Sequence, residues 1–313
     1  MSLFHEKSGR FSAEKTVAFM AAVLPVLWLC ADAALDRLGA RPVNAAIHFT
    51  GLFAVRFLLL SLAVTPARRL FDWPKLVLAR RCLGVAAFSY AALHLGLYVL
   101  DQGGNLYVVG REIVLRVYLA IGAVGLLLLL ALAVTSCDSV IRRMGGKRWL
   151  ALHQLVYLIA PLAILHFLIQ SKLDVTEAVL MGGLLMLLAF YRLAHRFFPP
   201  LDPARALVAG LAAGACTALL EVGWYAGTTG IDPRLVWEAN FTPSLGISPA
   251  WWVTGTGLAV AAAAAVWQRV KPSRKARGPG NSARKGAEGK ATLDKPAQQK
   301  SAKDKARLGV GAT

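Results

Sequence analysis

Long runs of apolar residues separated by short polar segments dominate the first 270 residues of the chain. A membrane span must bond its backbone internally, so it is either a helix of about 20 apolar residues or a strand of a closed barrel. The run from Ile121 to Val134 has no polar side chain, and it lacks the alternation of a barrel strand. The pattern therefore predicts an all-α fold, a polytopic transmembrane helix bundle. Its eight spans are expected near residues 17–35, 48–65, 82–100, 117–136, 149–170, 175–194, 206–227 and 250–268.

Composition agrees with a membrane protein, because 57% of the residues are hydrophobic and a soluble domain has about 45–50%. The formal net charge of +18 does not indicate nucleic-acid binding, since about half of it lies in residues 271–313. This segment mixes Lys and Arg with Gly, Ala, Pro and Ser, a composition that cannot form a packed core. We expect a disordered polybasic tail that contacts anionic membrane lipids.

The distribution of basic residues predicts how the spans are oriented. Loops rich in Lys and Arg face the cytoplasm, and such loops follow the second, fourth and sixth predicted spans, while the intervening loops are poorer in basic residues. The bias alternates in register with the eight spans. We therefore expect a multi-pass membrane protein with both termini in the cytoplasm.

A proline cluster marks a candidate domain boundary after the sixth span. Pro199, Pro200 and Pro203 interrupt the chain there, because proline cannot continue a helix. The expected organisation is a six-helix, histidine-bearing core in residues 1–198, a two-helix membrane addition in residues 199–270, and the tail in residues 271–313.

Four histidines lie in or at the margins of the predicted spans, namely His48, His94, His153 and His166. An ionisable residue inside a membrane is usually functional, although helix–helix hydrogen bonding is the alternative for any single histidine. Neutral imidazole is an axial ligand of haem iron, and helix bundles commonly hold cofactors between facing helices. His94 and His166 lie six and four residues before the extracytoplasmic ends of their spans, so their depths differ by only about 3 Å. They are the predicted ligands of one b-type haem (heme b) near the outer face.

His153 is the candidate ligand of a second, inner haem. It precedes His166 by 13 residues, about 20 Å along a helix and about 140° around it. Pro161 lies between the two and can kink or rewind the helix. His153 has no obvious partner, because His48 is at the opposite face. The sequence leaves open whether there are one or two haems.

Two further residues are candidates with open alternatives. His48 is either a further haem ligand or an interfacial polar residue. Arg56 follows it two turns later at mid-span, where an unpaired charge costs at least about 2.5–3.5 kcal/mol. A haem propionate, a flavin phosphate or a quinone oxygen would offset this cost, and the alternative is packing of the guanidinium against a helix carbonyl. Glu221 is a possible proton-handling residue, with a structural role as the alternative.

The sequence contains no dinucleotide-binding, P-loop or serine-hydrolase motif. Its four cysteines lie apart, in a spacing that indicates neither a disulfide framework nor a zinc site. We therefore expect any enzyme activity to belong to a partner, while the histidines favour a membrane-embedded electron-transfer subunit.

Four segments carry a resemblance to a known family. The segments IHFTGLFAVRFLLLSLAVTPARRL, ARRCLGVAAFSYAALHLGLYVL, GREIVLRVYLAIGAVGLLLLLALAVTS and RWLALHQLVYLIAPLAILHFL resemble the MsrQ (YedZ) family, within the ferric-reductase-like transmembrane group. The resemblance runs from about Thr16 to Arg196. It implies a six-helix core that binds b-type haem and FMN, with His94, His153, His166 and His48 at matching positions.

The resemblance also implies partners. Electrons would come from quinol or a cytoplasmic flavin reductase and pass to MsrP, a periplasmic molybdopterin enzyme that reduces methionine sulfoxide in proteins. Residues beyond Pro199 depart from the compact family pattern and carry no implied function. The alternatives are a related ferric or quinone reductase cytochrome b and, from a different class, a proton-coupled transporter.

Overall fold

The computed structural model describes residues 11–172, 174–242, 244 and 246–270. The predicted basic tail, residues 271–313, lies outside the described residues. Eight helices are long and apolar enough to cross a membrane, and the described part of the chain contains no β-strand. The predicted all-α bundle with eight spans is therefore confirmed.

Each predicted span corresponds to a helix or to a pair of adjoining helices. The long helices are α1 (Ala13–Ala34), α2 (Pro42–Leu70), α3 (Val77–Asp101, preceded by the 3₁₀ turn Pro74–Leu76), α5 (Val117–Val134), α8 (Val156–Ser171), α9 (Thr176–Phe197), α10 (Pro203–Thr229) and α12 (Pro249–Val270). Four short helices lie between or before them, α4 (Leu106–Leu115), α6 (Asp138–Met144), α7 (Gly146–His153) and α11 (Pro233–Ala239). Hydropathy does not reveal α4, α6 and α11, because they are too short to cross a bilayer.

The predicted fifth span comprises α7 and α8. α8 continues through Pro161, and the irregularity lies earlier, where the amides of Leu155, Tyr157 and Leu158 bond to carbonyls three residues back instead of four. This tighter winding is of the 3₁₀ type. It lies on the N-terminal side of Pro161, the side on which proline removes a helical hydrogen bond and crowds a carbonyl.

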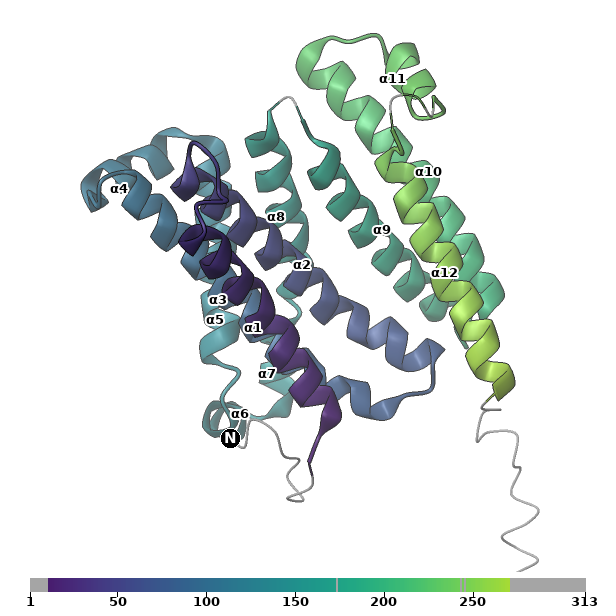
Figure 1. The fold of residues 1–313 in the computed structure, drawn as a ribbon. Coiled ribbons are helices and arrows are strands. Elements are labelled where there is room, and N and C mark those ends of the chain that lie inside the picture. Colours follow the sequence, from purple (N-terminus) through teal and green to yellow (C-terminus); the bar gives the residue numbers. More distant parts are fainter. Residues whose placement is uncertain (1–10, 173, 243, 245, 271–313) are drawn as a thin grey trace, which may run out of the picture. The chain divides into compact units, whose positions relative to one another are not determined.

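The helices that position the site pack in two pairs, α2 with α3 and α5 with α8. α9 lies between α8 and α10 (Figure 1) and contacts both. Ile159 of α8 and Val179 of α9 are completely buried in the shared hydrophobic core.

α10 and α12 approach each other at glycines. A Cβ atom added to Gly257 would lie 2.5 Å from the Cα of Gly210. Small residues allow such close helix packing in membranes. The predicted boundary after residue 198 falls in the segment between α9 and α10, and the division into domains stays a prediction. By its own contacts, the chain divides into a compact unit ending at Val266 and a C-terminal unit beginning at Trp267.

Candidate functional site

The structure brings His94 of α3 and His166 of α8 together. Their ring centroids are 6.4 Å apart, and the ring planes are almost perpendicular, at 86°. Each histidine lies close to the C-terminal end of its helix. The two residues predicted from sequence to share one depth therefore face each other across the bundle.

A backbone carbonyl on a neighbouring helix fixes the orientation of each ring. His94 Nδ1 lies 2.8 Å from the Ile47 carbonyl oxygen of α2, and His166 Nδ1 lies 2.7 Å from the Tyr118 carbonyl oxygen of α5. A carbonyl oxygen only accepts hydrogen bonds, so Nδ1 of each neutral ring is the protonated nitrogen and donates. Nε2 of each ring therefore keeps its lone pair for another partner.

Each ring also lies against a glycine of the same neighbouring helix. A Cβ atom added to Gly51 would be 2.9 Å from His94 Nδ1, and one added to Gly122 would be 2.9 Å from His166 Nδ1. Neither glycine was predicted to be functional. A small residue on the helix that faces each histidine would have identified these glycines in the sequence. A single sequence, however, does not reveal which helices face each other.

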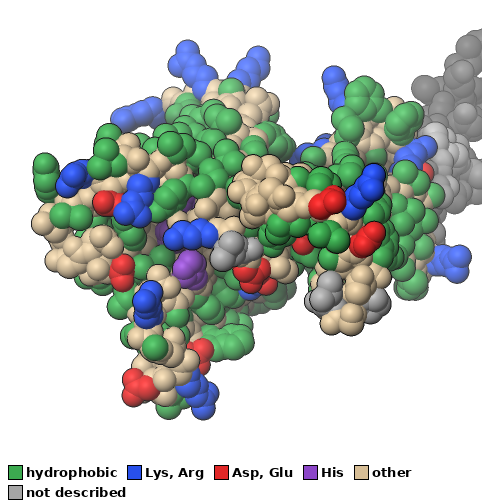
Figure 2. All heavy atoms as spheres, turned by 90° about the horizontal axis from the view of Figure 1, so that it is seen from above, with side chains coloured by type: hydrophobic (Ala, Val, Ile, Leu, Met, Phe, Trp, Pro, Cys, Tyr) green, Lys and Arg blue, Asp and Glu red, His purple; other side chains and the backbone are tan. Residues whose placement is uncertain are grey.

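His94 and His166 both line a cavity of about 490 Å³, which is within the size range of ligand sites. Its walls come mainly from α2, α3, α5 and α8 and are largely apolar, while polar side chains gather near one end, namely His48, Gln102, Glu112, Arg116, Gln170 and Lys172. Figure 2 shows histidine side chains reaching the face seen from above, with Lys and Arg around them. The cavity therefore combines an apolar interior with a polar mouth.

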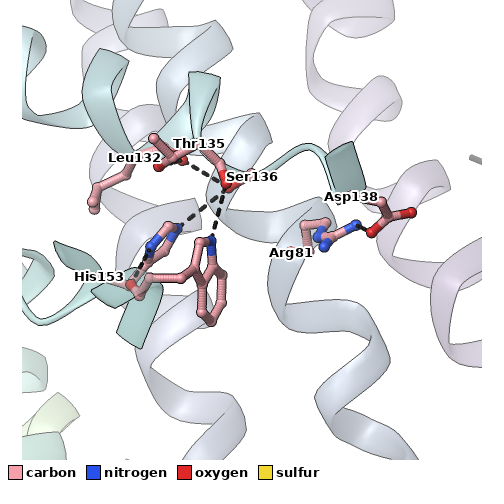
Figure 3. A network of polar contacts seen from close by, with 7 residues as sticks. Arg81, Leu132, Thr135, Ser136, Asp138 and His153 are labelled. Atoms are coloured by element: carbon pink, nitrogen blue, oxygen red, sulfur yellow. Dashed lines mark hydrogen bonds and ion pairs between the residues drawn. The ribbon is translucent and has the colours of Figure 1, made fainter. Parts of the chain in front are cut away.

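His153 lies outside the lining of this cavity, in a polar network between α5 and α7 (Figure 3). Its Nδ1 is 3.1 Å from the Trp149 carbonyl oxygen, its Nε2 is 3.4 Å from Ser136 Oγ, and its ring stacks on Trp149. Trp149 Nε1 donates to the Thr135 carbonyl. In the described part of the chain, none of the ring contacts of His153 is with another histidine, so an inner haem stays a prediction that rests on one ligand.

Arg56 also lies outside the lining of the cavity. Its guanidinium pairs with the Glu177 carboxylate of α9 at 3.5 Å and lies over the Phe53 ring, 5.1 Å from its centroid. The charge at mid-span therefore has an acidic partner within the protein, which is neither a cofactor nor the helix carbonyl expected as the alternative, and a role of Arg56 in cofactor binding stays a prediction.

Glu221 lines a second cavity, of about 380 Å³, together with Asn240 and Ser248. Its Oε2 is buried and has no hydrogen-bond partner among the described residues. A carboxyl group in this setting is suited to hold a proton, and its role stays a prediction.

The class of protein follows from comparison with known families. Residues 50–164, which include His94 but end two residues before His166, match the family model described as "Ferric reductase like transmembrane component". The chain is thus a membrane protein of the ferric-reductase-like class. No solved structure matches the chain.

Curated relatives narrow this class further. A "Protein-methionine-sulfoxide reductase heme-binding subunit MsrQ" from Rhodospirillum rubrum is 43% identical over 180 residues, which are 57% of this chain and 86% of the relative. Proteins of the same name from Azospira oryzae and Herminiimonas arsenicoxydans are each 36% identical over 195 residues, covering 84% and 89% of their lengths. The chain belongs to the MsrQ family, and the resemblance found in the sequence is confirmed.

Proposed function

We propose that this chain is a membrane subunit that binds haem b and delivers electrons to a methionine sulfoxide reductase. The observation that carries the proposal is the pair of facing imidazoles, His94 and His166, across an apolar cavity. The names of the relatives, which describe heme-binding subunits of a protein-methionine-sulfoxide reductase, support the same reading.

The spacing of the two rings fits a single iron held by both. An imidazole nitrogen binds a metal ion at about 2.0–2.1 Å, and the ring centroid lies about 1.2 Å behind that nitrogen, so two opposed ligands have centroids about 6.4–6.6 Å apart. The observed separation is 6.4 Å. The perpendicular ring planes do not prevent both residues from holding one metal ion, because each ring would bind through Nε2 alone.

Neighbouring backbone carbonyls orient the two imidazoles for metal binding. The carbonyls of Ile47 and Tyr118 hold Nδ1–H of each ring, which fixes the tautomer and makes Nε2 a stronger donor to a metal. The walls of the cavity that the two rings line are largely apolar. Bound haem would supply a one-electron carrier that alternates between ferric and ferrous iron.

The polar mouth of the cavity suits the carboxylates of haem b. Arg116 and Lys172 line it, and each can pair with a carboxylate. Arg116 is held by an ion pair with Glu112 and by a hydrogen bond to the Tyr118 hydroxyl. We assign these two cations to the cofactor's polar edge and His48 to the same end of the cavity.

The donor and recipient are proposed from the family. Quinol or a cytoplasmic flavin reductase would supply electrons, FMN would be a second cofactor, and the recipient would be the periplasmic enzyme MsrP. The alternating basic loops support an inner-membrane location with both termini in the cytoplasm. In this arrangement the His94–His166 pair lies near the periplasmic face, on the side of the recipient.

An absorption spectrum of the detergent-purified protein tests the proposal. We expect a Soret band that shifts on reduction, with α and β bands typical of a six-coordinate b-type cytochrome. A colourless protein after expression with ample haem supply would overturn the proposal and favour the transporter alternative. Reduction of methionine sulfoxide by added MsrP in proteoliposomes would distinguish the proposed partner from that of a related ferric or quinone reductase cytochrome.

A further inference from the structure

The two candidate haem ligands are held by the same local arrangement on two different helices. His94 is bonded to the carbonyl of Ile47 and lies against Gly51 of α2, while His166 is bonded to the carbonyl of Tyr118 and lies against Gly122 of α5. In both cases the carbonyl precedes the glycine by four residues. We call each carbonyl and its glycine a histidine cradle.

The spacing has a physical reason. Residues four apart lie on one face of a helix, about one turn from each other. A carbonyl oxygen has two lone pairs, so the carbonyl that accepts the helical bond from the glycine amide can accept a second bond from an imidazole. The imidazole reaches that oxygen only by lying flat against the helix, over the position of the glycine.

The space over each glycine decides whether the imidazole can reach the carbonyl. A Cβ atom on Gly51 would lie 2.9 Å from Nδ1 and 3.0 Å from Cε1 of His94, and one on Gly122 would lie 2.9 Å from both Nδ1 and Cε1 of His166. Contacts below 3.0 Å essentially never occur for real Cβ atoms, so even alanine would displace the ring. The atom displaced is the nitrogen that donates to the carbonyl.

We propose that Gly51 and Gly122 are positioning residues, which set the tautomer and orientation of the two haem ligands by admitting the imidazoles to the carbonyls of Ile47 and Tyr118. This inference rests on the proposed haem-binding function. Each glycine would affect the iron only through its histidine, because the glycine itself does not contact the metal.

The effect on the cofactor has a defined direction. A hydrogen bond from Nδ1–H to a carbonyl raises the basicity of Nε2, and partners of this kind affect metal affinity by about 10–100-fold. Losing the bond weakens donation to iron. Since a weaker donor stabilises the ferric state less, the midpoint potential should rise.

The chain offers a matched control on the helix of His94. Gly96 lies two residues from His94 in α3, does not line the cavity, and would place a Cβ atom in open space. Gly96→Ala therefore makes the same chemical change within a transmembrane helix without touching a ring.

The experiment compares full-length wild type, Gly51→Ala, Gly122→Ala and Gly96→Ala, each purified in detergent and selected as a monodisperse fraction by gel filtration. Apoprotein is titrated with haemin, and the midpoint potential of the loaded protein is measured by redox titration. We expect about 10–100-fold weaker haem binding, a raised midpoint potential, or both, in the two cradle variants, and wild-type values in Gly96→Ala.

Three outcomes would overturn the inference or its basis. If Gly51→Ala and Gly122→Ala match Gly96→Ala in affinity and potential, the cradles do not position the ligands. If both fail to give monodisperse protein while Gly96→Ala succeeds, the glycines serve helix packing alone. If wild type itself binds no haem, the proposed function fails, a result distinct from the other two.

Discussion

Trp149 stacks on His153 with ring centroids 4.0 Å apart, and its indole nitrogen donates to the Thr135 carbonyl, so the indole joins the ring of His153 to the end of α5. His94 and His166, in contrast, both line one cavity, and each uses Nδ1 to bond to a backbone carbonyl. The histidines therefore fall into two groups with different surroundings. Substitutions in the two groups should have different effects on the haem spectrum.

Replacing either ligand of the outer pair should abolish the outer haem. His94→Ala and His166→Ala each leave the iron with one imidazole, so we expect near-complete loss of the six-coordinate spectrum. His153→Ala should spare most of that spectrum, because His153 does not line the cavity. Difference spectra of the three purified variants measure this. Equal and complete loss in all three would indicate one structurally coupled site.

The topology can be tested with reporter fusions. We expect a fusion after Arg143 to report the cytoplasm and one after Arg234 to report the periplasm, because basic loops alternate along the eight spans. Alkaline phosphatase and fluorescent-protein reporters distinguish the two compartments. The reverse result at these two sites would show that a span has been miscounted.

Deleting Pro272 to Thr313 should leave haem content and electron transfer nearly intact and weaken attachment to anionic lipid. Each basic residue near an anionic surface contributes at most about 1 kcal/mol, and salt screens it within about 8 Å. Quinol-driven reduction of the partner should be compared in matched proteoliposomes containing full-length or truncated protein. A truncated protein that keeps its haem but loses nearly all turnover would show that the tail recruits an electron donor.

The close contact between α10 and α12 predicts a stability effect. Gly257→Ala places a Cβ atom 2.5 Å from the Cα of Gly210, so the helices must separate, at a cost of about 1–3 kcal/mol. Gly255→Ala on the same helix meets open space and serves as the control. Thermal unfolding in detergent should show a lower midpoint for Gly257→Ala alone; equal midpoints would contradict the packing.

The sequence predicted the long helices well, because a bilayer imposes a length and an apolar composition that the chain displays directly. The sequence also predicted that His94 and His166 lie at a common depth, because the helical rise per residue converts a position along a span into a depth. The short helices α4, α6 and α11 were missed, because no comparable constraint acts on segments outside the membrane.

Other features depend on which helix faces meet, and a single sequence does not record this. Arg56 looked like an uncompensated charge because its partner, Glu177, lies 121 residues away. Gly51 and Gly122 looked like ordinary small residues of membrane helices. Their role becomes visible only when α3 and α8 place an imidazole on each of them.

The two histidine cradles bear on how the protein is assembled. α2 with α3 and α5 with α8 form two helix pairs that also contact each other, and each pair contains one histidine together with its own carbonyl and glycine. A growing chain inserted only through α3 already has every residue needed to orient His94. The pair of α5 and α8, which is inserted later, likewise contains every residue needed to orient His166. If the protein binds haem as proposed, both ligands can therefore be oriented before the cofactor arrives, and haem would enter a site that is already arranged to receive it.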